Sequence, residues 1–181
     1  MKIALCATHL EKMILPQDRE YIGVDHGVEL LKQGITPKFA IGDFDSLQNR
    51  QTLENLNIQI LPERKDVTDT HAAIDYLLSK GYDEIEIYGV TGGRLDHFFA
   101  VMCLLEKYQD IKLKVIDQQN CIQLLKPGIY HIENKDYYYF SLFALNESSL
   151  SIKQAEYTLD HYLLKREDPL CVSNEVKGEY A

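Results

Sequence analysis

The chain has 181 residues, of which 45% are hydrophobic and 26% are charged, and its formal net charge is −9 at pH 7. This is the composition of a globular protein with enough length for one large or two small domains. The acidic net charge and the absence of a Lys/Arg cluster argue against a nucleic-acid partner. No apolar run approaches the ~18 residues that span a membrane. The four cysteines form no C-x-x-C pair, which favours reduced thiols in the cytoplasm.

The first two-thirds of the chain alternates short apolar runs with segments of helical periodicity. In chain order we predict a strand at residues 2–7, a strand at 21–24, a helix at 28–33, a strand at 38–41, a helix at 47–56, a strand at 58–61, a helix at 68–78, a strand at 84–88, a helix at 94–108 and a strand at 113–117. This alternation predicts an α/β domain over residues 1–118, in which helices cover a parallel sheet.

The pattern changes near residue 118. A Pro-Gly turn at residues 127–128 separates two predicted strands, and two more strands are predicted further on. The four strands are residues 121–125, 129–132, 137–145 and 150–153. We therefore expect a second, antiparallel β domain over residues 119–181.

Two aspartates directly follow the third predicted strand, where residues 42–46 read Gly-Asp-Phe-Asp-Ser. An extended backbone would point Asp43 and Asp45 to the same side. Two carboxylates so close repel each other unless a cation lies between them, and a divalent cation that also binds phosphate oxygens is the natural partner. Alternatively, Asp45 or Ser46 only caps the next helix, although a cap does not explain Asp43.

The segment after the fourth predicted strand reads Lys-Asp-Val-Thr-Asp at residues 65–69. Asp66 or Thr68 can cap the following helix and Asp69 then favours its first turn, which explains the segment by structure alone. Lys65, however, can also neutralise a phosphate.

A glycine pair stands between the fifth predicted strand and its helix, in Gly-Val-Thr-Gly-Gly-Arg-Leu-Asp-His at residues 89–97. A strand, a glycine turn and a helix start form a phosphate-binding arrangement, because bare N–H groups approach the anion and the helix dipole favours it. Arg94 adds a fork of donors, whereas Asp96 competes with phosphate unless a metal bridges them. A plain turn with a cap is the structural alternative.

The turns after successive strands of a parallel sheet share one edge, so these carboxylates can converge there together with Asp25, which follows the second strand. The residues therefore predict metal-assisted phosphoryl transfer, in which positioning and charge neutralisation supply most of the catalysis.

The combination of motifs resembles the thiamine pyrophosphokinase family. The shared motifs are Asp-x-Gly at residues 25–27, Gly-Asp-x-Asp-Ser at 42–46, Lys-Asp-x-Thr-Asp at 65–69, Gly-Gly-Arg-x-Asp-His at 92–97 and Ser-Asn-Glu at 173–175. The resemblance spans nearly the whole chain and implies an N-terminal α/β nucleotide-binding domain, a C-terminal β-sandwich that binds thiamine, and a homodimer.

The resemblance also implies a reaction, the transfer of the terminal pyrophosphoryl group of ATP to the hydroxyl of thiamine to give thiamine diphosphate and AMP. It implies that Mg²⁺ and the ATP phosphates are held by Asp43, Asp45, Asp69 and Asp96. These four aspartates and Arg94 are the implied catalytic residues. The resemblance also implies that Asp25 lies at the edge of these aspartates, that Thr68 and Arg94 contact ATP, and that Ser173 and Asn174 contact thiamine. The other residues that we predict to bind the nucleotide come from the motif turns themselves and are Lys65, Thr91, Gly92 and Gly93.

Three features depart from the family pattern. His26 stands where members commonly have Gly, and the chain has no Trp, so a Tyr or Phe must replace the Trp on which some members stack thiamine. Members also continue beyond the Ser-Asn-Glu segment, whereas this chain ends at Ala181, so we expect either a trimmed sandwich or an incomplete sequence there.

Two other functions compete with this interpretation. Residues 43–46 resemble the nucleophile turn of haloacid-dehalogenase-like phosphohydrolases, in which Asp43 would become phosphorylated. The same residues could instead form a non-catalytic module that binds Mg-ATP while the β domain engages a protein. A trapped phospho-aspartate would favour the first, and ATP binding without AMP formation in the presence of thiamine would favour the second.

Overall fold

The computed structural model describes residues 1–7, 13–44, 47, 50–61, 66–133 and 135–181. The chain divides into two compact units, Met1–Lys126 and Pro127–Ala181. Within the described part, no helix combines the length and the apolar character that crossing a membrane requires.

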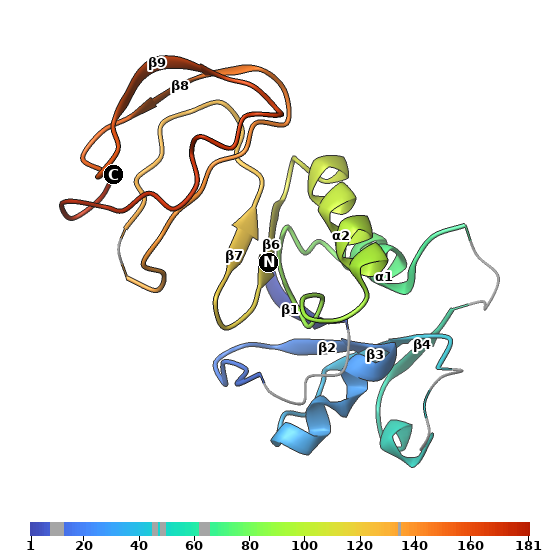
Figure 1. The fold of residues 1–181 in the computed structure, drawn as a ribbon. Coiled ribbons are helices and arrows are strands. Elements are labelled where there is room, and N and C mark those ends of the chain that lie inside the picture. Colours follow the sequence, from blue (N-terminus) through green and yellow to red (C-terminus); the bar gives the residue numbers. More distant parts are fainter. Residues whose placement is uncertain (8–12, 45–46, 48–49, 62–65, 134) are drawn as a thin grey trace. The chain divides into compact units, whose positions relative to one another are not determined.

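The first unit contains a seven-stranded sheet in the order β4-β3-β2-β1-β5-β6-β7 (Figure 1). Its strands are β1 (Lys2–Cys6), β2 (Tyr21–Val24), β3 (Phe39–Gly42), β4 (Ile58–Ile60), β5 (Glu84–Tyr88), β6 (Lys112–Ile116) and β7 (Cys121–Gln123). All neighbours from β4 to β6 are parallel, and β7 pairs antiparallel with β6. The chain builds outward from β1 to β4 and then crosses to β5, so the strand order reverses between β1 and β5.

Helices cover both faces of this sheet. The α-helices are α1 (Asp69–Ser79) and α2 (Leu95–Lys107), and the 3-10 helices are η1 (Asp25–Gln33) and η2 (Arg50–Leu53). Ile3 and Leu5 of β1 belong to the same core as the buried residues of α1 and α2, whereas Ala4 and Cys6 pack in the core that contains Leu30 of η1. Because successive side chains of a strand point to opposite faces, β1 is buried on both sides.

Local sequence explains why α1 begins where it does. Thr68 is its N-cap, and the Thr68 hydroxyl accepts a hydrogen bond from the His71 N–H at 3.2 Å. The residues that α1 turns inward are Ala73, Ile74 and Leu77, which are spaced along one helical face. The start of α1 is therefore held at the edge of the sheet where the strands end.

The second unit has one regular antiparallel pair, β8 (Ser148–Ile152) with β9 (Leu159–Leu164). Isolated bridges join its other extended segments, namely Glu133 with Tyr180, Phe140 with Asn174, and Ala155 with Val176. The residues buried in its core are Ala144, Ile152, Ala155, Leu164 and Cys171.

The predicted fold class is confirmed: a parallel α/β unit is followed by an antiparallel β unit. Some element predictions are wrong. Within the described residues of the helix predicted at 47–56, only η2 is helical. Asn55, two residues beyond the end of η2, has a left-handed φ of 67°, which a continuing helix cannot contain. Residues 129–132 form no strand, and the bridge that follows them is at Glu133. Residues 137–145 pair through a single bridge at Phe140, and β9 has no counterpart among the predicted elements.

The first predicted strand of the β domain belongs instead to the first unit. It forms β7, which pairs with β6 in the register Val115 to Ile122. The compact units accordingly divide after Lys126, whereas the sequence-based boundary stands at residue 118, ahead of β7.

A buried charge cluster holds the middle of the sheet together. Glu86 of β5 is only 4% exposed; its carboxylate accepts hydrogen bonds from Lys2 Nζ at 2.6 Å, Arg19 Nε at 2.9 Å and the Tyr88 hydroxyl at 3.1 Å. Burial raises the pKa of Glu86, but the hydrogen bonds from Lys2 and Arg19 outweigh burial and bring the pKa below its ordinary value. The ionised carboxylate thus links β1, β5 and the segment that leads into β2.

We expect Glu86→Gln to lower the free energy of unfolding at pH 7 by about 2 kcal/mol, because two cations lose their partner. A carboxyl with a lowered folded-state pKa stabilises the fold above its ordinary pKa of 4.5, and this contribution is lost as the pH falls through the folded-state value. The difference in stability between wild type and Glu86→Gln should therefore shrink between neutral and acidic pH. Urea unfolding at pH 7, 5 and 3 measures it.

Glu84→Gln is the matched control. Glu84 lies two positions earlier on β5 and also approaches Lys2, but at 3.6 Å and with 28% of its side chain exposed. Exposed ion pairs contribute little, so this variant should unfold within ~0.5 kcal/mol of wild type. Equal effects of the two substitutions would contradict the special role of Glu86.

Candidate functional site

Most of the predicted site residues lie at one edge of the sheet. Asp25 and Asp43 directly follow β2 and β3, and Asp69 and Asp96 stand in the first turns of α1 and α2. In a parallel sheet each strand ends, and each following helix begins, at the carboxyl edge. Two of the predicted residues, Asp45 and Lys65, lie outside the described residues. The reversal of strand order between β1 and β5 makes this edge the expected place for a ligand.

The turns after β2 and β3 are in close contact. Asp25 Oδ1 lies so near Gly42 that a Cβ atom added to Gly42 would be 2.0 Å from it, and this oxygen is buried. Asp25 therefore lies against the residue that precedes Asp43. Any side chain at position 42 would displace the Asp25 carboxylate, which explains why Gly42 belongs to the motif.

A second close approach joins the start of η1 to the end of β1. A Cβ atom added to Gly27 would lie 1.8 Å from the carbonyl oxygen of Cys6. Gly27 makes this contact, so His26 does not prevent the turn from approaching β1. The departure from the family pattern at position 26 is thus compatible with a tightly packed turn.

The backbone between Asp43 and Asp45 is not extended, and that expectation is wrong. Phe44 has a left-handed φ of 55° and is only 3% exposed, because its ring packs in a core with Val28 and Ala40. A left-handed conformation costs a bulky residue of order 1–3 kcal/mol, and such strain concentrates at functional sites. Asp25, with a φ of 46°, and Ser173, with a φ of 59°, share this conformation in two other predicted site turns.

The start of α1 offers a carboxylate and a hydroxyl to the same edge. Asp69 is the first residue of the helix, and its Oδ1 is buried. Thr68 accepts the capping bond through Oγ1, and its own O–H hydrogen can donate to a ligand oxygen.

Arg94 and Asp96 form an ion pair at the start of α2. Arg94 Nε lies 3.1 Å from Asp96 Oδ1, its NH2 nitrogen lies 2.6 Å from Oδ2, and Oδ1 also accepts from the His97 N–H at 3.0 Å. The hydrogen bond from Arg94 lowers the pKa of Asp96 below its ordinary value. Both side chains are largely exposed, so the guanidinium can exchange this carboxylate for an incoming phosphate.

The donor set at this edge suits magnesium carried by a nucleotide. Among the residues that the structure describes, no three His, Cys, Asp or Glu side chains are grouped closely enough to hold one metal ion. Mg²⁺, however, keeps several waters and usually takes one or two carboxylates together with substrate phosphates. Asp25 and Asp69 each have a buried carboxylate oxygen. These residues fit a magnesium ion that is bound together with substrate phosphates better than one that is bound by protein ligands alone.

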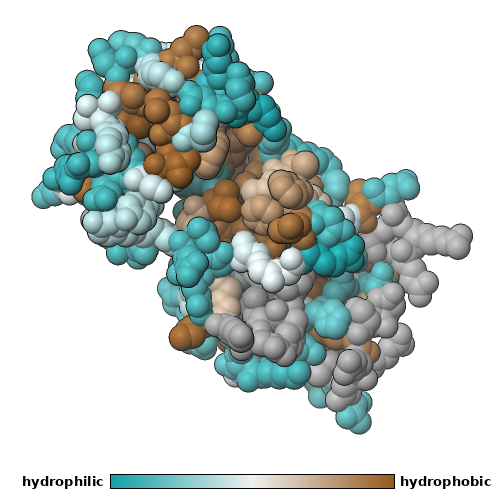
Figure 2. Space-filling model, in the orientation of Figure 1, coloured by the Kyte–Doolittle hydropathy of each residue, from teal (hydrophilic) through white to brown (hydrophobic). Residues whose placement is uncertain are grey.

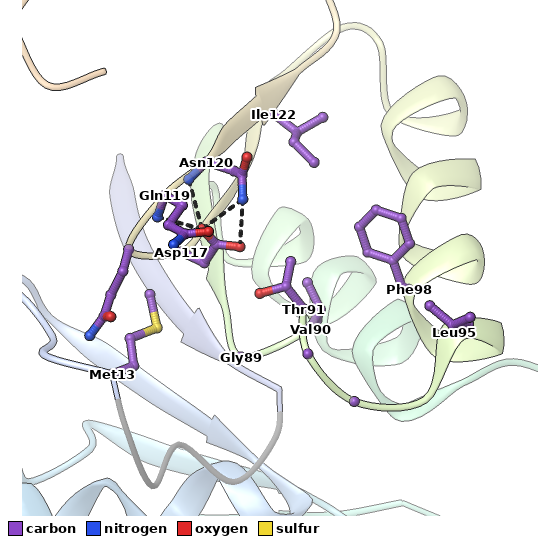
Figure 3. Close-up of a pocket in the computed structure, with 13 residues that line it drawn as sticks. Met13, Gly89, Val90, Thr91, Leu95, Phe98, Asp117, Gln119, Asn120 and Ile122 are labelled. Atoms are coloured by element: carbon purple, nitrogen blue, oxygen red, sulfur yellow. Dashed lines mark hydrogen bonds between the residues drawn. The ribbon is translucent and has the colours of Figure 1, made fainter. Parts of the chain in front are cut away.

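An open pocket of about 820 Å³ lies beside the glycine turn (Figure 3). Its walls are residues 89–93, Leu95 and Phe98 of α2, residues 117–120, Ile122 of β7 and Met13. The predicted residues Thr91, Gly92 and Gly93 line it, and a Cβ atom added to Gly92 or Gly93 would meet nothing within 4 Å. The backbone of this turn is therefore open to a ligand.

The turn at residues 117–120 carries no motif and is absent from the predicted site. Asp117 accepts hydrogen bonds from the N–H groups of Gln119 and Asn120, both at 2.7 Å, and from the Asn120 side-chain amide at 3.1 Å. Burial raises the pKa of Asp117, but these bonds outweigh it and lower the pKa below its ordinary value. The available signal was positional, because Asp117 directly follows β6, the strand next to the one that leads into the glycine turn.

The predicted thiamine residues lie in the second unit. Asn174 is 3% exposed, its Oδ1 accepts from the N–H groups of Tyr157 at 3.0 Å and Glu175 at 2.9 Å, and its Nδ2 donates to the Tyr157 carbonyl at 2.7 Å. The Asn174 amide therefore holds the backbone beside exposed Ser173. Tyr157 is 66% exposed and is an aromatic residue next to this segment, in a chain that has no Trp.

Comparisons with known proteins cover both units. The model of the thiamin pyrophosphokinase catalytic domain matches residues 12–116, and that of the thiamin pyrophosphokinase vitamin B1 binding domain matches residues 129–181. The chain is 41% identical over 166 residues to a thiamine pyrophosphokinase of Bacillus subtilis (strain 168), and the match covers 86% of this chain and 78% of that protein.

Solved structures agree with these matches. A crystal structure of thiamine pyrophosphokinase from Bacillus subtilis has a TM-score of 0.87 and 34% identity, with 99% of this chain and 92% of that chain covered. One from Geobacillus thermodenitrificans also has a TM-score of 0.87, with 30% identity and coverage of 99% and 90%. The structure from Candida albicans, at 18% identity, a TM-score of 0.73 and coverage of 98% and 83%, shows the shared fold alone.

Proposed function

The chain belongs to the thiamin pyrophosphokinase family, and on that premise we propose that it transfers the pyrophosphoryl group of ATP to the hydroxyl of thiamine, giving thiamine diphosphate and AMP. The observation that carries this proposal is the match of both family domains, in order, over the two units of one chain. The glycine turn and the carboxylates at a single edge of the sheet support it, because phosphoryl transfer depends on positioning and charge neutralisation.

We assign the nucleotide half of the site to the first unit. Asp43, Asp45, Asp69 and Asp96 would hold Mg²⁺, which when bound neutralises phosphate charge and orients the transferred group. Asp25 would lie at the rim of this set, and Lys65 and Thr68 would contact phosphate oxygens. The open backbone at Gly92 and Gly93 and the start of α2 would receive the phosphates, with Arg94 turning from Asp96 to the anion.

The transfer itself is an in-line displacement. The thiamine hydroxyl oxygen forms a bond to the β-phosphorus of ATP, the bond from that phosphorus to the oxygen of the α-phosphate breaks, and AMP leaves with the electron pair. The hydroxyl proton passes to a carboxylate of the site or to solvent. Ser173, on the segment that Asn174 holds in place, would contact thiamine.

A direct assay tests the proposed function. Protein, Mg-ATP and thiamine are mixed, and AMP and thiamine diphosphate are measured by chromatography. Equal amounts of the two products are expected. Phosphate release without an acceptor, together with a trapped phospho-aspartate at Asp43, would instead favour a phosphohydrolase, and ATP binding without AMP formation would favour a non-catalytic nucleotide sensor.

Arg94→Ala should lower kcat/KM for ATP more than about tenfold, or over ~1.4 kcal/mol of transition-state stabilisation, because a fixed fork of donors to the phosphates is lost. Arg94→Lys should recover only part of the loss, since an ammonium cannot bind two phosphate oxygens in parallel. Steady-state kinetics with varied ATP measure both. The matched control is Arg166→Ala in the second unit, where Arg166 bonds the Leu145 carbonyl at 3.3 Å. An unchanged value in Arg94→Ala would remove Arg94 from the site.

We also propose that the protein is a cytoplasmic homodimer. The outer face of α2 exposes large apolar side chains one helical turn apart, since Leu95 is 70% and Phe99 63% exposed, and Figure 2 shows apolar surface over this helix. Exposed apolar patches of this kind often mark interfaces. The chain has a mass of 20.9 kDa. Size-exclusion chromatography with light scattering should therefore give twice that mass.

A further inference from the structure

We propose that the turn between β6 and β7, residues 117–120, recognises the nucleoside part of ATP, and that Asp117 accepts hydrogen bonds from the ribose hydroxyls. The proposal deepens the proposed function and rests on it, because it takes a ribonucleotide as the ligand. Asp117 would be a specificity-determining residue outside the sequence motifs at residues 25–27, 42–46, 65–69, 92–97 and 173–175.

Asp117 directly follows β6, next to the strand that leads into the glycine turn. β5, α2 and β6 form one strand–helix–strand unit, and the parallel register pairs Tyr88 with Ile116. The residues that follow, Gly89 and Asp117, therefore leave adjacent strands side by side, roughly 4.8 Å apart. In dinucleotide-binding units of this kind the glycine turn after the first strand receives phosphate and an acidic residue at the end of the next strand bonds the ribose.

Hydrogen bonds hold the Asp117 carboxylate in place for this role. The bonds from the Gln119 and Asn120 N–H groups both end on Oδ1, and the Asn120 side chain lies 3.1 Å from Oδ1 and 3.2 Å from Oδ2 (Figure 3). The carboxylate is thereby fixed in one orientation, with Oδ2 as the oxygen that can accept from a ligand hydroxyl. Thr91 of the glycine turn lines the same pocket, and its hydroxyl lowers the pKa of Asp117.

The two walls of the pocket differ in their chemistry. Figure 3 places Leu95 and Phe98 of α2 on one side of the pocket and the Asp117, Gln119 and Asn120 side chains on the other. An apolar wall suits the flat face of a base, whereas carboxylate and amide groups suit hydroxyls and base edges. The pocket therefore offers a ribonucleoside both kinds of contact next to a turn that is open to phosphate.

A purely structural role for Asp117 is the competing explanation, because aspartates often close turns in this way. Asp168 supplies a matched example in the second unit, where its carboxylate accepts from the Leu170 N–H at 3.0 Å and the Tyr162 hydroxyl at 2.5 Å. Both aspartates thus accept a hydrogen bond from the backbone N–H two residues further on, but of the two only Asp117 lines the pocket. A comparison of the two separates turn closure from ligand recognition.

The experiment measures equilibrium binding of ATP and of 2′-deoxyATP, each with Mg²⁺, by calorimetry. Wild type should bind ATP at least about tenfold more tightly than 2′-deoxyATP, because a hydrogen bond to a charged group is lost with the hydroxyl. Asp117→Asn keeps an oxygen for the turn while it removes the charge. It should weaken ATP binding about tenfold and bring the two nucleotides within roughly twofold of each other. Asp168→Asn should leave both affinities unchanged.

The outcomes separate this inference from the proposed function. If ATP is preferred in this way but no thiamine diphosphate forms, the transferase proposal fails and the ribose assignment stands. The ribose assignment is overturned if wild type binds the two nucleotides equally or binds neither. It is also overturned, even in an active enzyme, if folded Asp117→Asn keeps the wild-type preference for ATP. The wild-type comparison needs no substitution, so a variant that fails to fold does not prevent the decision.

Discussion

Asp43→Asn is expected to abolish turnover, with kcat lowered at least about a thousandfold, or ~4 kcal/mol, while the protein remains folded. Asp43 directly follows β3, and the Gly42 before it packs against the Asp25 carboxylate. Asn has the size of Asp but no charge, so the substitution removes a proposed magnesium ligand and little packing. The loss should appear in kcat because charge neutralisation is needed most in the transition state.

The measurement is the rate of AMP and thiamine diphosphate formation at saturating Mg-ATP, with thermal unfolding to verify that the variant is folded. Asp110→Asn is the matched control, since Asp110 pairs with Lys126 and has 86% of its side chain exposed ahead of β6, at the opposite edge of the sheet. This control should retain the wild-type rate. A wild-type rate in Asp43→Asn would refute the metal-binding role of Asp43.

Gly27→Ala is expected to cost more than about 3 kcal/mol in the free energy of unfolding, a large share of the 5–15 kcal/mol that stabilises a typical domain. The added methyl carbon would lie 1.8 Å from the Cys6 carbonyl oxygen and 2.7 Å from its carbonyl carbon. These are backbone atoms at the end of a buried strand, and they cannot rotate away as a side chain can. Separating η1 from β1 would also move Asp25, so activity should fall with stability.

The matched control is Gly93→Ala. A Cβ atom at Gly93 meets nothing within 4 Å, so its free energy of unfolding should stay within ~0.5 kcal/mol of wild type. Its KM for ATP should nevertheless rise, because the methyl group would occupy space proposed for the phosphates. Urea unfolding and steady-state kinetics on both variants give the comparison, and wild-type stability in Gly27→Ala would contradict the close approach.

Much of the fold follows from local patterns. Strand β2 has the predicted bounds, and α1 begins after the predicted Thr68 cap, because the spacing of apolar residues and a capping hydroxyl act over a few neighbouring residues. The order of strands and helices was sufficient to predict the parallel sheet. The motif turns could be assigned to one edge for the same reason, since in such a sheet every strand that runs in the same direction ends there.

By itself, then, the sequence determined the fold class, the family and the edge at which the carboxylates and the glycine turn gather. The tertiary structure alone decided that β7 joins the first sheet, that Phe44 turns left-handed to bury its ring, and that the Asn174 amide binds the backbone of Tyr157. It also placed Thr91 and Asp117 together in the lining of a pocket that no motif predicted. These features depend on hydrogen bonds and packing between residues far apart in the chain, whereas local periodicity reports only what a segment does with its own neighbours.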